Sequence, residues 1–98
     1  MGNRGQSNYA AAKSGLHGAC KSLAIELASR GVTANVVAPG IIQGRLTAEI
    51  FDREQIDRLV PMKRAGTPAE VAALIHFLSS DDAAYISGQI ISINGAMA

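Results

Sequence analysis

Two side chains near the N-terminus have types and a spacing that could transfer a proton. Tyr9 and Lys13 lie four residues apart in the stretch NYAAAK, so a helix would place both on one face. A lysine ammonium one turn away favours the phenolate and lowers the pKa of the phenol. A phenol tuned in this way can exchange a proton with an alcohol or ketone oxygen. A surface tyrosine beside a solvated lysine has the same spacing, so the pair alone does not establish catalysis.

The residues on both sides of this pair predict the helix that would carry it. The polar, glycine-rich stretch GNRGQ at residues 2–6 predicts a loop, and Ser7 or Asn8 is a suitable N-cap. An alanine-rich helix is then expected up to Arg30, with Gly31 able to supply a left-handed C-terminal residue. Apolar residues form one stripe of this helix at spacings of four, three and four, namely Leu16, Cys20, Leu23 and Leu27.

A buried strand is expected directly after the helix. Residues 32–38, VTANVVA, are an uncharged run rich in β-branched residues, and Pro39-Gly40 ends it. A helix followed at once by a buried strand is typical of half of a parallel α/β unit. Because ligands bind at the carboxyl ends of parallel strands, Pro39-Gly40 is a candidate ligand site, although an ordinary turn has the same residues.

The middle of the chain predicts short helices and then one well-capped helix. Residues 41–60 have an imperfect helical pattern after Gly44, so we expect one or two short helices, followed by a loop in PMKRAGTP. Thr67 is a suitable N-cap, with proline at the first helical position and Glu70 at the third. This helix is expected to reach Leu78 or Ser79, where SSDDAA breaks it.

Residues 89–93, QIISI, predict a second buried strand that ends at Asn94-Gly95. Two strands form a weak sheet on their own. Both strands are expected to be buried on two faces, which a chain of 98 residues can hardly arrange. The sequence is therefore expected to be part of something larger, either through oligomerisation or as a piece of a longer fold.

Composition and charge exclude several classes of function. The chain has 98 residues, 48% hydrophobic and 17% charged, which is typical of one small globular domain. With a net charge of +1, neither nucleic acid nor a membrane is an expected partner. Cys20 is the only cysteine, which fits a reducing compartment, so we expect a cytoplasmic location. His17 and His76 have no partner at metal-ligand spacing, and no metal is expected.

The chain resembles the short-chain dehydrogenase/reductase family. The resemblance rests on NYAAAK, NVVAPG, PMKRAGTPAEVA and the ending YISGQIISINGAMA, and it spans essentially the whole chain without a gap. Within the family, the chain is most similar to reductases of 3-oxoacyl thioesters carried by acyl carrier protein in bacterial fatty acid synthesis. The implied fold is the C-terminal part of a Rossmann-like, doubly wound parallel α/β sheet, with two strands and three to four helices over residues 1–98.

This resemblance implies roles for five residues. Tyr9 would be the general acid that protonates the carbonyl oxygen as hydride arrives from NADPH. Lys13 would lower the pKa of Tyr9 and hydrogen-bond the nicotinamide ribose. Pro39, Gly40 and the backbone of Ile42 would lie along the nicotinamide ring, with Ile42 reaching its carboxamide. The segment after Ile42 would be a mobile substrate lid.

The resemblance also implies partners. Arg30 matches a basic position that contacts the acidic acyl carrier in such reductases, and it is explained equally well as a favourable charge at a helix C-terminus. The family forms homo-dimers and tetramers. Gly15 and Gly18, with Ala11 and Ser14, make a small-residue face on the first helix. We expect that face to pack either against a second copy or against the chain's own sheet.

Two departures from the family pattern limit these expectations. The glycine-rich nucleotide-binding half, the catalytic serine and the catalytic asparagine of the family would all lie before Met1. Gly44 stands where the family commonly has a threonine that contacts the cofactor, so a hydroxyl donor is lost and the lid hinge is looser. The choice of NADPH over NADH is an expectation of the family alone, because the residues that select between them lie in the absent half.

The chain by itself is therefore expected to have little or no activity, whereas the full-length parent would be an NADP-dependent oxidoreductase. Two alternatives stay open. The chain could be a non-catalytic interaction or assembly fragment that keeps the helix and tail surfaces. It could also come from a reductase of the same family that acts on another alcohol or ketone.

Overall fold

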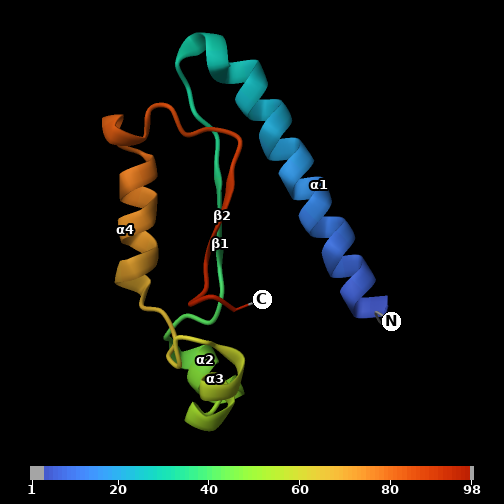
Figure 1. Cartoon of the computed structure of the whole chain (residues 1–98), viewed down its shortest axis with the longest axis vertical. Coiled ribbons are helices and arrows are strands. Elements are labelled where there is room, and N and C mark those ends of the chain that lie inside the picture. Colours follow the sequence, from blue (N-terminus) through green and yellow to red (C-terminus); the bar gives the residue numbers. More distant parts are fainter. Residues whose placement is uncertain (1–3, 98) are drawn as a thin grey trace.

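The computed structural model describes residues 4–97, and it describes side chains from residue 10 onward. Two long helices flank a pair of parallel strands, and two short helices lie beyond the carboxyl ends of these strands (Figure 1). This arrangement confirms the expected α/β class with a parallel sheet. In chain order the helices and strands are α1 (Arg4–Leu27), β1 (Val36–Pro39), α2 (Arg45–Ile50), α3 (Arg53–Leu59), α4 (Pro68–Leu78) and β2 (Ile90–Ile93).

The first helix begins earlier than the sequence indicated. Because α1 starts at Arg4, the predicted loop over residues 2–6 is wrong from that residue onward, while residues 2 and 3 lie outside the described residues. The prediction of an N-cap at Ser7 or Asn8 is also wrong, because both lie inside the helix. A glycine in a helix interior costs only about 1 kcal/mol, so Gly5 does not stop an alanine-rich helix from extending backwards.

The other end of α1 is close to the prediction. A 3₁₀ turn, η1 (Ala28–Arg30), continues the helix to its expected last residue. Gly31 then adopts a φ of 70°, and its N–H donates to the Ala28 carbonyl. This is the left-handed C-terminal residue that only glycine supplies without strain.

The two strands pair in parallel, with Val36 opposite Ile90 and Pro39 opposite Ile93. Residues 89–93 were the predicted second strand, and β2 matches them to within one residue. β1 starts at Val36 instead of residue 32 because side chains hold the residues before it. The Ala34 N–H donates to Ser87 Oγ at 3.1 Å, and the Asn35 amide binds the loop that leads to β2.

Two short helices form in residues 41–60, as expected. Asp52 caps α3 through a capping box with Gln55, in which each side chain accepts a hydrogen bond from the other residue's backbone N–H at 2.8 Å. Gly44 occupies the N-cap of α2 and supplies no side-chain hydrogen bond. In the segment expected to form a lid, α3 therefore has a side-chain cap and α2 has none.

Local chemistry accounts for α4. Thr67 caps this helix, its Oγ1 accepts from the Glu70 N–H at 3.1 Å, and the Glu70 carboxylate accepts from the Thr67 N–H at 2.9 Å. Pro68 occupies the first turn, and the helix ends at Leu78, as predicted. A 3₁₀ turn, η2 (Asp81–Ala83), then interrupts the chain within SSDDAA.

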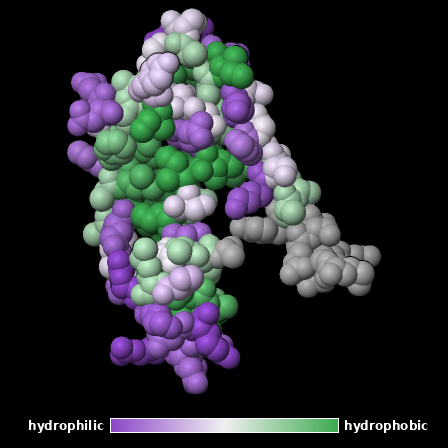
Figure 2. Space-filling view, in the orientation of Figure 1, coloured by the Kyte–Doolittle hydropathy of each residue, from purple (hydrophilic) through white to green (hydrophobic). Residues whose placement is uncertain are grey.

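The core of the described residues is small and consists of small or medium side chains. The expectation that both strands are buried on two faces is not met in this chain, where every strand residue is at least partly exposed. Apolar side chains over the strands remain visible from outside (Figure 2). Among the described helices, none is long and apolar enough to cross a membrane. The buried apolar residues are Cys20, Ala24, Val60, Ala65 and Ala83.

The two glycines of the small-residue face of α1 point to open space. A Cβ atom built on Gly15 or Gly18 would meet no atom within 4 Å. Among the described residues, these two positions therefore do not pack against the chain's own sheet, whereas Ser14 of the same face lines a cavity with Ile90 and Ser92. Leu16 and Leu23 on the same helix are about half exposed, at 50% and 48%.

Candidate active site

Lys13 lies on α1 next to the sheet. Its side chain lines a cavity of about 210 Å³ together with Leu16 from the same helix and Ala38 and Ile90 from the strands. It also lines a neighbouring cavity that reaches Ser92 near the end of β2. Tyr9 stands one turn before Lys13 on the backbone of α1, and its side chain lies outside the described residues.

The end of β1 is fixed by close backbone contact. The Gly40 N–H donates to the Ile93 carbonyl at 3.0 Å, which extends the strand pairing by one residue. A Cβ atom on Gly40 would lie 2.6 Å from Asn94 Cβ, so a larger residue does not fit without movement. Pro39, directly before it, is exposed and has no N–H to donate, so it offers an apolar surface at the strand end.

The backbone of Ile42 is held on both sides. The Ile41 carbonyl accepts from the Gly66 N–H at 2.9 Å, and the Gln43 N–H donates to the Gly66 carbonyl at 2.7 Å. The Ile42 carbonyl accepts from the Thr47 hydroxyl. Among the hydrogen bonds of the described residues, none uses the Ile42 N–H. A positioned, unpaired donor near the carboxyl end of β1 fits the amide oxygen of a nicotinamide carboxamide.

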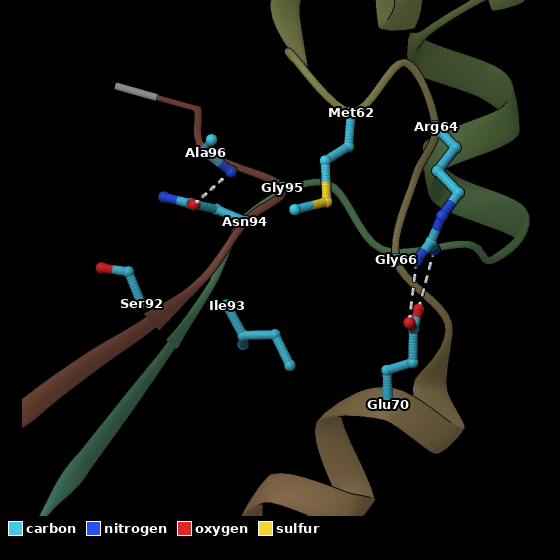
Figure 3. Close-up of a pocket in the computed structure, with 9 residues that line it drawn as sticks. All are labelled: Met62, Arg64, Gly66, Glu70, Ser92, Ile93, Asn94, Gly95 and Ala96. Carbon is cyan, nitrogen blue, oxygen red and sulfur yellow. Dashed lines mark hydrogen bonds and ion pairs between the residues drawn. The ribbon is translucent and has the colours of Figure 1, made fainter.

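A cavity of about 310 Å³ lies at the carboxyl end of β2 (Figure 3). It is bounded by the end of the strand and by the loop between α3 and α4. The Met62 N–H of that loop donates to the Gly95 carbonyl at 3.2 Å. Gly95 has a φ of 63°, and a Cβ atom there would lie 2.7 Å from Val60 Cγ1. The loop and the chain after β2 are therefore packed directly against each other.

An ion pair joins the loop between α3 and α4 to the first turn of α4. Two guanidinium nitrogens of Arg64 donate to the two carboxylate oxygens of Glu70, both at 2.9 Å (Figure 3). The hydrogen bonds from Arg64, followed by the backbone hydrogen bond from Thr67, lower the pKa of Glu70 to about 2. The same pairing raises the pKa of Arg64. Glu70 thus stays ionised at any ordinary pH and serves the helix cap and the ion pair together.

Arg30 does not gather with the other predicted positions. Arg30 closes η1, about 26 Å from Lys13 at 1.5 Å per helical residue, at the opposite end of the molecule from the lid. Gly44 is extended, and a Cβ atom there would meet nothing within 4 Å. The space that a threonine side chain would occupy at this position is therefore empty of described atoms.

Sequence reasoning missed four residues that build this site. Gly66 and Thr47 hold Ile42, Asn94 packs on Gly40, and Ser92 shares a cavity with Lys13. Asn94 gave the only usable signal, because its pairing with Gly95 after a strand marks the carboxyl end where ligands bind. The others depend on contacts between residues far apart in the sequence.

Comparison with known proteins agrees with this geometry. Residues 1–97 match the family model described as enoyl-(acyl carrier protein) reductase. The chain is 52% identical over 99 residues to the 3-oxoacyl-(acyl-carrier-protein) reductase FabG of Escherichia coli and 50% identical to that of Buchnera aphidicola. These alignments include 99% of the chain and 41% of either relative, so the chain spans about two fifths of their length.

The similarity extends to three dimensions. The crystal structure of YwfH, an NADPH-dependent reductase involved in bacilysin biosynthesis, superposes with a TM-score of 0.77 at 37% identity. That superposition includes 84% of the chain and 36% of YwfH. With the family match over nearly every residue and a similar overall fold, the chain belongs to the short-chain dehydrogenase/reductase family.

Proposed function

We propose that this chain forms the C-terminal part, residues 1–98, of a cytoplasmic reductase that uses NADPH to reduce 3-oxoacyl thioesters on acyl carrier protein in fatty acid synthesis. The observation that carries the proposal is the Ile42 backbone. Gly66 fixes the peptide planes on both sides of it, and no hydrogen bond among the described residues uses its N–H, three residues after β1 ends. The relatives at about 50% identity support the choice of substrate class.

In this proposal, NADPH supplies the hydride, and the residues of this chain hold the cofactor and move one proton. Tyr9 donates its phenolic proton to the carbonyl oxygen and is left as a phenolate until solvent reprotonates it. The Lys13 ammonium stabilises that phenolate and donates to the hydroxyls of the nicotinamide ribose. The Ile42 N–H binds the carboxamide, and Pro39-Gly40 lies along the ring.

A fusion protein tests this assignment directly. The chain is joined to the N-terminal segment of the Escherichia coli relative, and NADPH oxidation by an acetoacetyl thioester is measured. We expect turnover by the fusion, little or none by the 98-residue chain, and a loss of about 10²–10⁴ in kcat for Tyr9→Phe. Lys13→Met should also reduce kcat.

Matched controls separate chemistry from folding. Tyr85 is fully exposed and lies outside the cavities that Lys13 lines, so Tyr85→Phe removes the same hydroxyl away from the candidate site. Lys21 lies two turns beyond Lys13 on α1 and is exposed, so Lys21→Met is the lysine control. The proposal fails if Tyr9→Phe retains the turnover of Tyr85→Phe.

The partners are part of the same proposal. Arg30 is exposed at the end of η1, where it is free to meet an acidic acyl carrier. Arg30→Glu should raise the KM for a carrier-bound thioester and leave the KM for a small thioester unchanged. An equal effect on both substrates would contradict this role.

A homo-dimer or tetramer is proposed from the open glycine positions on α1, and sedimentation of the fusion with Gly18→Leu would test it.

A second function is favoured by the exposed apolar side chains of α1. Leu16, Leu23 and Ile25 are 50%, 48% and 70% exposed. A non-catalytic assembly fragment would use this surface without holding a cofactor. That hypothesis predicts an oligomeric chain that binds no NADPH, and a fusion protein that remains inactive.

A family reductase with another substrate would instead turn over a small ketone faster than the thioester.

A further inference from the structure

The loop between α3 and α4 hydrogen-bonds the backbone around Ile42 through Gly66. Gly66 donates to the carbonyl before Ile42 and accepts from the N–H after it, at 2.9 and 2.7 Å. These bonds fix the peptide planes on both sides of Ile42. The direction of the Ile42 N–H therefore depends on where Gly66 is held.

Gly66 is held by an ion pair that spans it. Arg64 lies two residues before Gly66 and binds the carboxylate of Glu70, four residues after it, through two bonds of 2.9 Å. Arg64 also donates to the Ala65 carbonyl at 3.1 Å. The Thr67 N–H donates to Glu70 Oε1 at 2.9 Å. The residues on both sides of Gly66 are thus tied to the first turn of α4.

Packing links the pair to Ile42 as well. A Cβ atom at Gly66 would lie 3.0 Å from Ile42 Cδ1 and 3.8 Å from Glu70 Oε1, so all three groups meet at this point. The side chains of Arg64 and Glu70 are 54% and 43% exposed. Exposed ion pairs contribute little to global stability, whereas a bidentate pair imposes a defined geometry. Geometry is therefore the main contribution that this pair can make.

We propose that Arg64 and Glu70 are positioning residues that hold Gly66 and thereby orient the Ile42 N–H toward the nicotinamide carboxamide. The identity of the group that this N–H binds rests on the proposed function. The fixing of the Ile42 backbone by the ion pair does not, and it can be measured without a cofactor.

Amide hydrogen exchange tests the fixing, in the 98-residue chain and in the fusion protein. Arg64→Met removes the charge and keeps a long side chain. Glu70→Gln weakens the ion pair but retains a capping box, because glutamine also serves at the third helical position. In both variants we expect the amides of Gln43 and Gly66 to exchange about fivefold faster, with no change at Gly40.

Thr67→Ala is the matched control, because it removes the capping hydroxyl, together with its 3.3 Å hydrogen bond to Glu70 Oε1, and leaves both charged partners of the ion pair. Its largest effect should be at the Glu70 N–H, which donates a hydrogen bond to that hydroxyl. The inference is overturned if Arg64→Met leaves Gln43 and Gly66 as protected as in the unaltered chain. It is also overturned if Thr67→Ala exposes them equally.

Kinetics of the fusion protein supply a readout that a purely structural role would not move. We expect Arg64→Met and Glu70→Gln to raise the KM for NADPH about fivefold, with kcat within about twofold of the unaltered fusion. Loss of kcat without a change in KM would overturn the inference and leave the proposed function intact. Faster exchange at Gln43 in an inactive fusion would support the positioning role and count against the proposed function.

Discussion

The carboxyl end of the sheet and the outer face of α1 differ in how their glycines are used. At the sheet end, a Cβ atom on Gly40 or Gly95 would lie 2.6 or 2.7 Å from a neighbouring side chain. On α1, Gly15 and Gly18 face open space. The end that carries Gly40 and Ile42 is closely packed by other residues of this chain. The helix that carries Tyr9 and Lys13 has an apolar and small-residue surface that the described residues leave largely open.

The largest effect on stability is expected from a substitution at the packed carboxyl end of the sheet. Gly95→Ala introduces a Cβ atom into a left-handed residue and into Val60, and should lower the free energy of unfolding by about 3 kcal/mol. Gly18→Ala should raise it by up to about 1 kcal/mol, because alanine favours the helix and meets no neighbour. Urea unfolding of the two variants measures the contrast. Equal effects would mean that the two regions are not packed differently.

Large-to-small substitutions sharpen the same contrast. Val60 is 2% exposed, and Val60→Ala should lower the free energy of unfolding by about 2 kcal/mol. Ile25 is 70% exposed, and Ile25→Ala should change it by less than about 0.5 kcal/mol in the 98-residue chain. In the fusion protein or in an oligomer, Ile25→Ala should become more costly if its side chain is covered there. An unchanged cost would show that this part of α1 stays exposed to solvent.

A smaller gain in stability is expected from a substitution at Gly44, the residue before α2. Gly44 is extended and has free space, so Gly44→Thr should stabilise the chain by about 0.5 kcal/mol through a less flexible unfolded state. The restored hydroxyl should also lower the KM of the fusion protein for NADPH. Gly31→Thr is the opposite control, because a φ of 70° disfavours a β-branched residue. A Gly44→Thr variant with lower stability would show that the lid needs the glycine.

The smallest effect is expected from pH. The pKa of Glu70 is lowered from 4.5 to about 2, so its ion pair stabilises the folded state fully above pH 4.5. That stabilisation is lost as the pH falls from 4.5 through about 2, because the folded carboxylate is then protonated. The difference in urea midpoint between the unaltered chain and Glu70→Gln should shrink over this range. Added salt should weaken it too, and a difference as large at pH 2 as at pH 7 would contradict the assignment.

Elements with local causes were predicted well. The capping box of Thr67 and Glu70, the proline after it and the left-handed Gly31 all act within a few residues, so the sequence alone indicates them. The start of α1 was missed because Ser7 and Asn8 are good caps that can also lie inside a helix. The start of β1 was missed because the Ala34 N–H donates to the Ser87 hydroxyl and so does not pair with a strand.

The candidate site also has features with local causes and features that depend on contacts between distant residues. The spacing of Tyr9 and Lys13, the proline and glycine at a strand end, and the family motifs can be read from residue order, and they determined the reductase hypothesis. Only the tertiary structure decided that Gly66 holds Ile42, that Asn94 packs on Gly40 and that Arg64 braces the loop. Backbone hydrogen bonds and close approaches join residues that the sequence does not relate. Side-chain types specify such contacts only after the chain has folded and brought them together.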